Sequence, residues 1–422
     1  MAQVALGIDC GTSGIRIAAV TRGGVLVSLA SANILAPITS CGTRHQQDPA
    51  SWWKALHEAF ANLDIKDYQP VALAIDGTSG TILSVDATGN PIGVASMYND
   101  IAETSDVAKI AAVAPLESAA RGGTSPLSRA LPLQKGAAHI LHQADWLMGK
   151  FCGHFDISDE NNALKTGYDP VARCWPPWIA ATGLDVKLLP RVVPVGTRIG
   201  IITTEAAALF NLPNDLAIVS GTTDGCAAFL ASGACKVGDG VTSLGTTLTL
   251  KLLSAEPIFA PRYGIYSHRI GDQWLAGGAS NSGGGVLHKF FSNEQLAVLT
   301  QQLQPDSSTG LDYYPLSEVG ERFPIADACL EPRLMPRPEN DLIFYQAILE
   351  GIASVEALGY QRLRELGASP LISMRSLGGG AGNTAWTKIR LKKLGVPALP
   401  ALSEHPAVGT ALLAWREVPH RD

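Results

Sequence analysis

Two short turns rich in glycine and hydroxyl side chains lie far apart in the chain, within residues 7–16 and 243–247. Each lies in an apolar, β-branched run, a pattern that predicts strand, turn and strand. Glycine lets the backbone approach an anion, and Ser or Thr hydroxyls can donate to it, so both turns could cradle phosphate. Asp9 precedes the first turn, where its carboxylate is best explained by a metal ion bridging it to a phosphate. The pair indicates a phosphoryl-transfer enzyme with two similar domains.

Each of these motifs also has a simpler interpretation. Asp, Gly and Thr are ordinary turn residues, so the segment around Asp9 could be only a hairpin. Arg16, on the outgoing strand, could contact a phosphate or pair with a surface carboxylate. Asp224 could cap the helix that follows it, or it could accept the proton of an attacking hydroxyl group. Its position after the predicted strand 216–220 supports the second role.

A glycine-rich segment at 378–383 follows an apolar strand and precedes a predicted helix start at Thr384. From Gly380 it matches the looser dinucleotide fingerprint, but only about forty residues follow, too few for a Rossmann domain. A flat adenine lying against glycine backbone, with Asn383 at its edge, is more consistent with this segment. The chain has no Walker A run, no His-Arg-Asp catalytic loop and no Gly-x-Ser-x-Gly nucleophile elbow, which disfavours P-loop, protein-kinase and serine-hydrolase folds.

The composition predicts a compact α/β protein of two or three domains. The chain has 422 residues, of which 46% are hydrophobic and 17% charged. Its net charge of -6 argues against nucleic-acid or anionic-membrane partners. The seven cysteines are odd in number and form no Cys-x-x-Cys pair, which argues against a disulfide framework and a zinc site. They are Cys10, Cys41, Cys152, Cys174, Cys226, Cys235 and Cys329.

The first predicted strand begins at Val4, which leaves no room for a signal peptide, and no run of about 18 uninterrupted apolar residues follows. We therefore expect a cytoplasmic protein, a monomer or homodimer, that acts on a small molecule. His139 and His142 are expected on one face of a surface helix rather than in a metal site, because no third ligand is near them in the sequence.

Hydrophobic periodicity outlines the order of elements. It predicts an antiparallel meander over 4–29, a helix over 49–63 capped by Asp48, and a buried strand over 71–75 that ends at Asp76-Gly77-Thr78-Ser79-Gly80. A strand at 81–85 is expected to extend the same sheet, and residues 100–190 are expected to form a mainly helical insertion.

The strand-turn-strand pattern restarts near Val237, after a predicted helix that ends before Gly233. A long helix is expected over 341–366. We predict an N-terminal domain of residues 1–232 and a C-terminal domain of residues 233–422, which would form a cleft.

Six segments, in this order, resemble motifs of the FGGY carbohydrate kinases. They are 7–16, 220–228, 245–247, 310–324, 378–383 and 404–411. The resemblance implies an α/β fold of two actin-like, ribonuclease H-like domains that flank a central cleft. It also implies ATP-dependent phosphorylation of a sugar hydroxyl with Mg²⁺.

The resemblance further implies a role for each matching residue. Asp224 would be the catalytic base, and Asp9 would bind substrate and lie on the metal side. The γ-phosphate donors would be Gly11, Thr12 and Ser13, with Thr12 counted as catalytic. The remaining nucleotide contacts would be Arg16, Gly245, Thr246, Gly310, Gly379, Gly380 and Asn383.

The substrate loop departs from the common family pattern. Many members carry a Gln-x-His-Gly-like segment, whereas this chain has Asp76-Gly77-Thr78-Ser79-Gly80-Thr81. Together with the segments 143–147 and 311–315, this loop resembles the short D-ribulokinase branch, so we expect Asp9, Ser79 and Asp224 to hold D-ribulose. D-Xylulose, L-ribulose and glycerol are alternative acceptors. An actin-like ATPase that uses nucleotide as a switch, without a sugar substrate, is the alternative from another class.

Overall fold

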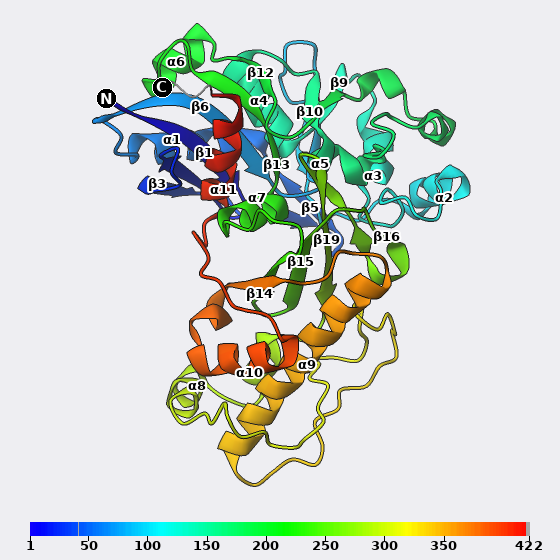
Figure 1. The fold of residues 1–422 in the computed structure, drawn as a ribbon. Coiled ribbons are helices and arrows are strands. Elements are labelled where there is room, and N and C mark those ends of the chain that lie inside the picture. Colours follow the sequence, from blue (N-terminus) through cyan, green and yellow to red (C-terminus); the bar gives the residue numbers. More distant parts are fainter. Residues whose placement is uncertain (41, 419–422) are drawn as a thin grey trace. The chain divides into compact units, whose positions relative to one another are not determined.

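The computed structural model describes residues 1–40 and 42–418 (Figure 1). The chain divides into two compact units. Unit 1 contains Met1–Gly233, His268–Gly271 and the described chain from His405 on, and unit 2 contains Ala234–Ser267 and Asp272–Glu404. The division after Gly233 lies next to the predicted boundary, but residues 268–271 and 405–418, which we had expected in the C-terminal domain, pack with unit 1.

The main sheet of unit 1 has six strands in the order β12-β13-β6-β1-β2-β3. Their bounds are β1 Ala2–Cys10, β2 Gly14–Val20, β3 Leu26–Asn33, β6 Tyr68–Gly77, β12 Arg198–Ile201 and β13 Ala217–Thr223. The first three strands form the predicted antiparallel meander. By contrast, β6 runs parallel to both β1 and β13. The carboxyl ends of these three parallel strands therefore meet at one edge, where open α/β sheets bind ligands.

One face of this sheet is covered by large apolar side chains. The helices α1 (Pro49–Ala61), α4 (Gln143–Cys152) and α6 (Thr204–Phe210) contribute to a core that includes Trp52, Leu56 and Phe151. Asp48 caps α1 as predicted, because its side chain accepts a hydrogen bond from the backbone N–H of Ala50 at 2.9 Å. Residues 100–190, predicted as a mainly helical insertion, thus contribute α4 to this core.

The opposite face is covered by two helices with small side chains, α7 (Asp224–Ala231) and α11 (Pro406–Ala414). Figure 1 shows α11, in red, next to β1 and α7. A Cβ atom at Gly7 on β1 would overlap the carbonyl of Ala407, and one at Gly409 would overlap the carbonyl of Ala227. Glycine at these two positions therefore lets α11 lie directly against the sheet and against α7.

A second sheet in unit 1 corrects the prediction for residues 81–85. Its order is β4-β5-β8-β7-β9, formed by β4 Ile38–Ser40, β5 Arg44–Gln47, β7 Ile82–Val85, β8 Ala95–Ser96 and β9 His139–His142. The prediction that residues 81–85 extend the main sheet is wrong, because the turn at 78–81 redirects the chain and β7 pairs with β8 and β9. Gly80 makes that turn possible with a φ of 97°, a conformation that side chains with a Cβ rarely adopt.

The region 100–190 contains both helices and strands. It includes α2 (Thr104–Val113), α3 (Pro126–Leu133), α5 (Glu160–Ala163) and β10 (Ile157–Asp159), which pairs with β11 (Arg191–Val193). The expected surface helix at His139 and His142 is wrong. Both residues belong to β9, and the helix α4 begins only after them, at Gln143. His142 is buried, with 2% of its surface exposed.

Unit 2 is built on the strands β19, β15, β14 and β20, adjacent in this order. The bounds in this part of the chain are β14 Asp239–Leu244, β15 Leu248–Ser254, β16 Phe259–Ala260, β17 Ile265–Tyr266, β18 His268–Ile270 (in unit 1), β19 Gln273–Ser280, β20 Ser373–Leu377, α8 Asn293–Thr300, α9 Asp341–Glu365 and α10 Thr384–Leu394. The long helix α9 packs on β15 and β19, and a fully buried ion pair between Glu356 and Arg390, at 2.6 Å, joins α9 to α10.

The structure bears on two features of the sequence, its apolar segments and its cysteines. One described helix, α9, has the length and apolar composition of a membrane span, but 72% of its most apolar window is buried in the protein, as in a core helix. Cys41 lies outside the described residues, and the other six cysteines form no disulfide bond with one another.

Candidate active site

Three aspartates gather at the edge of the unit 1 sheet where the parallel strands β1, β6 and β13 end. Asp9 ends β1 beside Asp76 of β6, and Asp224 follows β13, which pairs with β6 through Thr222. Asp9 is 4% exposed and Asp76 is fully buried. Arg16 Nη1 lies 3.3 Å from Asp9 Oδ2, so Arg16 pairs with this carboxylate in the structure. Charged carboxyl groups this close repel one another, which makes their protonation states interdependent.

Burial is the main cause that raises the pKa of Asp9, and the charge of Asp224 adds to it, while Asp76 and Arg16 oppose the rise. Burial and the charge of Asp9 raise the pKa of Asp76 well above its usual range. Asp76, the more deeply buried of the two, is therefore the carboxyl group that more readily keeps a proton, and its Oδ1 atom has no hydrogen-bond partner among the described residues. Thr410 Oγ1, on α11, donates to Asp76 Oδ2.

The structure therefore adds Asp76 to the candidate residues, although the sequence analysis assigned it no role. A signal was present, since Asp76 directly follows a predicted buried strand, as Asp9 does. The missing information was that these two strands are parallel neighbours in register.

The hairpin between β1 and β2, which is predicted to bind phosphate, is fixed by hydrogen bonds to its backbone. The N–H of Gly11 donates to the carbonyl of Gly14 at 3.0 Å, and the carbonyl of Thr12 accepts from Gln47 Nε2 at 3.1 Å. Ser13, at the tip, is exposed, and its carbonyl accepts from the N–H of Ile34 at 3.0 Å. The chain tip between β1 and β2 is thus fixed beside Asp9.

Asp224 is the first residue of α7, and Thr223 occupies the N-cap position without a side-chain capping bond. The Oδ1 atom of Asp224 accepts from the N–H of Gly225 at 2.7 Å. A carboxylate in the first helical turn is stabilised by the helix dipole. Asp224 is therefore not the N-cap residue of α7, although its carboxylate accepts from a free N–H of the first helical turn, which fixes its orientation.

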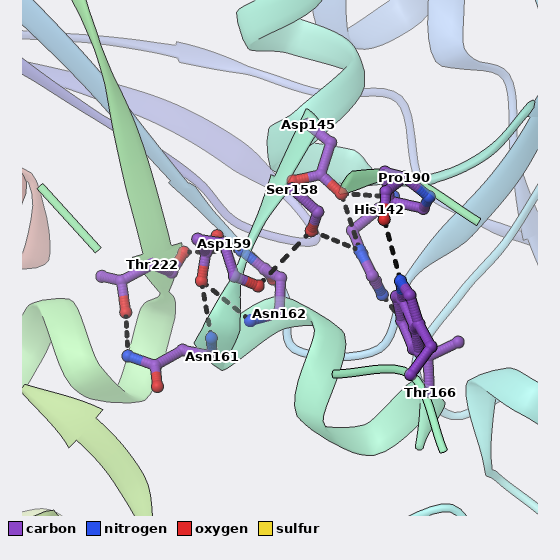
Figure 2. Close-up of polar contacts among 10 residues, drawn as sticks. His142, Asp145, Ser158, Asp159, Asn161, Asn162, Thr166, Pro190 and Thr222 are labelled. Atoms are coloured by element: carbon purple, nitrogen blue, oxygen red, sulfur yellow. Dashed lines mark hydrogen bonds and ion pairs between the residues drawn. The ribbon is translucent and has the colours of Figure 1, made fainter. Parts of the chain in front are cut away.

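A buried polar network reaches the end of β13 from the segment that follows β10 (Figure 2). Asn161 Nδ2 donates to Thr222 Oγ1 at 2.9 Å, and Asn162 Nδ2 donates to the carbonyl of Thr222 at 3.1 Å. Asp159 accepts from the N–H groups of Asn161 and Asn162 at 2.8 and 2.9 Å. Burial, followed by the charge of Asp145, raises the pKa of Asp159 to about 7.

The same network also contains His142, whose two ring nitrogens both lie within hydrogen-bond distance of other side chains. Its Nδ1 atom lies 2.7 Å from Asp145 Oδ2, and its Nε2 atom lies 2.8 Å from Thr166 Oγ1 (Figure 2). Both ring nitrogens thus have protein partners, as in a structural histidine. Within residues 1–40 and 42–418, no three His, Cys, Asp or Glu side chains are arranged to hold a metal ion.

Ser79 lies in the turn between β6 and β7. Its Oγ atom is buried, and it has no hydrogen-bond partner within the described part of the chain. Most buried polar groups in proteins are hydrogen-bonded, so this hydroxyl group is a candidate for contact with a ligand.

Unit 2 contains a pocket of about 450 Å³ that is lined by five of the ten predicted nucleotide contacts. Gly245, Thr246, Gly379, Gly380 and Asn383 all line it. Asn383 also caps α10, with its Oδ1 atom 2.9 Å from the N–H of Trp386. A pocket of this size lies in the range for small-molecule sites.

Gly310 is not among the residues that line this pocket; it is exposed, with a φ of 71°. Other lining residues were missed by the sequence analysis, including His288, Thr300 and Tyr345. The run of glycines at 283–285 was an available signal for His288. A Cβ atom at Gly283 or Gly285 would approach Thr246 within 2.7 Å, so these glycines let the two segments pack at the pocket.

Comparisons with known proteins identify the family of this chain. Residues 4–116 match the N-terminal domain model, and residues 240–418 the C-terminal domain model, of the FGGY family of carbohydrate kinases. A xylulose kinase of Staphylococcus epidermidis is 23% identical over 98% of this chain and 87% of the relative. An L-fuculokinase of Escherichia coli O157:H7 is 24% identical over 98% and 92%.

Solved structures show the same fold. A xylulose kinase from Rhodospirillum rubrum superimposes with a TM-score of 0.85 at 22% identity, over 98% of this chain and 89% of that one. A Plasmodium falciparum glycerol kinase with ADP has a TM-score of 0.83 at 17% identity, over 99% and 90%. The α/β fold is therefore the predicted actin-like, ribonuclease H-like fold of sugar kinases, and the chain belongs to the FGGY family of carbohydrate kinases.

Proposed function

We propose that this ATP-dependent sugar kinase phosphorylates D-ribulose at its 5-hydroxyl group, giving D-ribulose 5-phosphate and ADP. Kinase activity on a sugar follows from the family. The observation that carries the choice of D-ribulose is the buried hydroxyl of Ser79, which has no partner in the described chain and stands where many family members have a Gln-x-His-Gly-like segment.

Asp224 is the base in this proposal. Its carboxylate takes the proton from the 5-hydroxyl while the sugar oxygen forms a bond to the γ-phosphorus, and the bond from that phosphorus to the β,γ-bridging oxygen breaks. The support is positional, because α7 directs Asp224 to the sheet edge where Asp9 and Asp76 also lie. Asp9 holds the sugar from the carboxyl end of β1, on the other side of β6 from β13, and the backbone of residues 11–13 binds the transferred phosphoryl group.

Mg²⁺ fits the residues at this edge. Magnesium is usually held by one or two carboxylates together with phosphate oxygens and water, rather than by a complete protein cage. The Asp9 carboxylate can supply that single ligand, and Asp76, whose pKa burial raises well above its usual range, lies beside it on β6. When bound, the ion would neutralise phosphate charge during transfer.

The nucleotide would lie in the unit 2 pocket, with adenine against the backbone of Gly379 and Gly380. Thr246 would contact the phosphates, and the tips of Asn383 and Tyr345, 3.4 Å apart, would form the polar end of the adenine site. Arg16, which pairs with Asp9, would reach a phosphate only after exchanging that partner.

D-Xylulose is the leading alternative acceptor, because relatives over nearly the whole chain are named xylulose kinase. L-Ribulose and glycerol remain further candidates. The decisive experiment is coupled-assay ADP formation with Mg-ATP on D-ribulose, D-xylulose, L-ribulose and glycerol, with a blank that contains no sugar. The highest kcat/KM on D-ribulose would support the proposal, and a higher value on another acceptor would refute the substrate choice. ATP turnover independent of every sugar would instead favour the ATPase switch.

A further inference from the structure

The turn at residues 78–81 is held from both ends by a chain of hydrogen bonds. Gln143 Oε1 accepts from both the N–H and the Oγ1 of Thr78, each at 3.0 Å. The Oγ1 atoms of Thr78 and Thr81 are 2.6 Å apart, and Thr81 Oγ1 accepts from the N–H of Tyr98 at 3.1 Å. Because each hydroxyl has one proton, Thr81 donates to Thr78 and Thr78 donates to Gln143. Such chains strengthen each other in a buried site.

Arg129 fixes the middle of the same turn. This residue lies on α3, is 2% exposed, and donates through Nη2 to the carbonyl of Gly80. Nη2 also donates to the carbonyl of Thr124 at 3.2 Å, and Nη1 donates to the carbonyl and Oγ of Ser96 at 2.9 and 2.8 Å. Burial lowers the pKa of Arg129 only to about 10, so it remains a cation at neutral pH.

These bonds leave one side-chain hydroxyl of the turn unused. The hydroxyls of Thr78 and Thr81 form hydrogen bonds within the turn and to Gln143. Ser79 lies between Thr78, which bonds Gln143, and Gly80, which bonds Arg129. Its buried Oγ has no partner within the described chain. A buried polar group without a partner is costly, and a sugar hydroxyl would satisfy it. The position of the Ser79 hydroxyl is thus set by Gln143 and Arg129, neither of which needs to contact the sugar.

We propose that Thr78, Gln143 and Arg129 are positioning residues that hold Ser79 in the orientation that selects the acceptor sugar. This inference rests on the proposed function, in which Ser79 contacts the sugar. Loosening the turn is therefore expected to change KM for the acceptor and the preference between ketopentoses. KM for ATP and the slow ATP hydrolysis without sugar are expected to stay the same, because the nucleotide contacts come from other segments.

The test compares Thr78→Val with Thr78→Ser in the full-length enzyme. Valine keeps the shape of threonine but removes the Oγ1 atom that bonds Gln143 and Thr81, whereas serine keeps it. We expect Thr78→Val to raise KM for D-ribulose about tenfold and to reduce the ratio of kcat/KM between D-ribulose and D-xylulose by a similar factor. Thr78→Ser should stay within about twofold of the wild type. Ser128→Ala is a matched control, because the Ser128 hydroxyl on α3 is also buried without a described partner, and it should change neither value.

Each result has a definite meaning. If Thr78→Val keeps the wild-type KM and sugar preference while Ser79→Ala changes them, the positioning role is refuted and the proposed function stands. If the wild type uses no sugar, both proposals fail together. Should Thr78→Val not fold, Gln143→Met and Gln143→Glu test the same bonds from the other side. The glutamate keeps the acceptor oxygen, so it should preserve sugar preference and the methionine should lose it. Equal losses in both variants would refute positioning through Oε1.

Discussion

The titration of Asp159 should make the stability of the protein fall as pH rises from about 4 to 7. Burial raises the pKa of Asp159 from the usual 3.8 to about 7 in the folded chain. In this pH window the folded state keeps a proton that the unfolded state has released, so rising pH favours unfolding. About three pKa units, at about 1.4 kcal/mol each, correspond to about 4 kcal/mol lost across the window.

The measurement is urea unfolding of the wild type and Asp159→Asn at half-unit steps between pH 4 and 8. Asparagine keeps an acceptor oxygen for the N–H groups of Asn161 and Asn162 but cannot titrate. The difference in free energy of unfolding, wild type minus variant, should fall by about 1.4 kcal/mol per pH unit in the middle of the window. Subtracting the variant removes the contribution of the other carboxyl groups that titrate in both proteins.

A second variant tests the stated cause. The charge of Asp145 contributes to the raised pKa of Asp159, after burial, so Asp145→Asn should move the end of the window to lower pH without abolishing it. Parallel curves for the wild type and Asp159→Asn between pH 4 and 7 would refute the reasoning. They would show that Asp159 has the same protonation in the folded and unfolded states, despite its burial.

Three further predictions concern the site. Asp224→Asn should lower kcat on the preferred sugar about 10² to 10⁴-fold at constant KM for ATP, in the coupled ADP assay, and near-normal kcat would exclude the base role. Thr410→Val removes the donor to Asp76 and should cost about 1–3 kcal/mol of unfolding free energy in urea, whereas an unchanged midpoint would mean that this bond contributes nothing. Gly380→Ala would place a Cβ atom 2.5 Å from Trp386, so it should raise KM for ATP several-fold while KM for the sugar stays constant, and an unchanged KM for ATP would argue against adenine at this wall.

The features that sequence predicted correctly are those fixed by neighbours in the chain. The hairpin between β1 and β2 needs only two apolar strands and a turn of small residues, and α7 follows directly from the Ala-rich run after Asp224. Asp48 is recognisable as a cap because its partner, the N–H of Ala50, is two residues away. Local rules of this kind depend on steric and hydrogen-bond terms within one turn of backbone.

The features that sequence missed depend on which segments meet in three dimensions. Residues 81–85 have the apolar character of a strand, but nothing within them specifies that they pair with β8 and β9 rather than with the main sheet. His142 resembles a surface histidine by its spacing from His139, yet its partners Asp145 and Thr166 bury it completely. Periodicity predicts that a residue lies in an element and leaves the neighbours of that element open.

The contacts of α11 join the segments that lie farthest apart in the chain, and they also affect the carboxyl groups of the site. Gly409 lies inside α11, where glycine lowers intrinsic helix stability by about 1 kcal/mol relative to alanine. The structure explains it, because any side chain there would overlap α7 at Ala227, the helix that begins with Asp224. One position later, Thr410 bonds Asp76, 334 residues away in the chain. The same helix therefore packs closely against α7 and donates a hydrogen bond to Asp76. Part of the geometry of the unit 1 site thus depends on residues near the C-terminal end of the described chain.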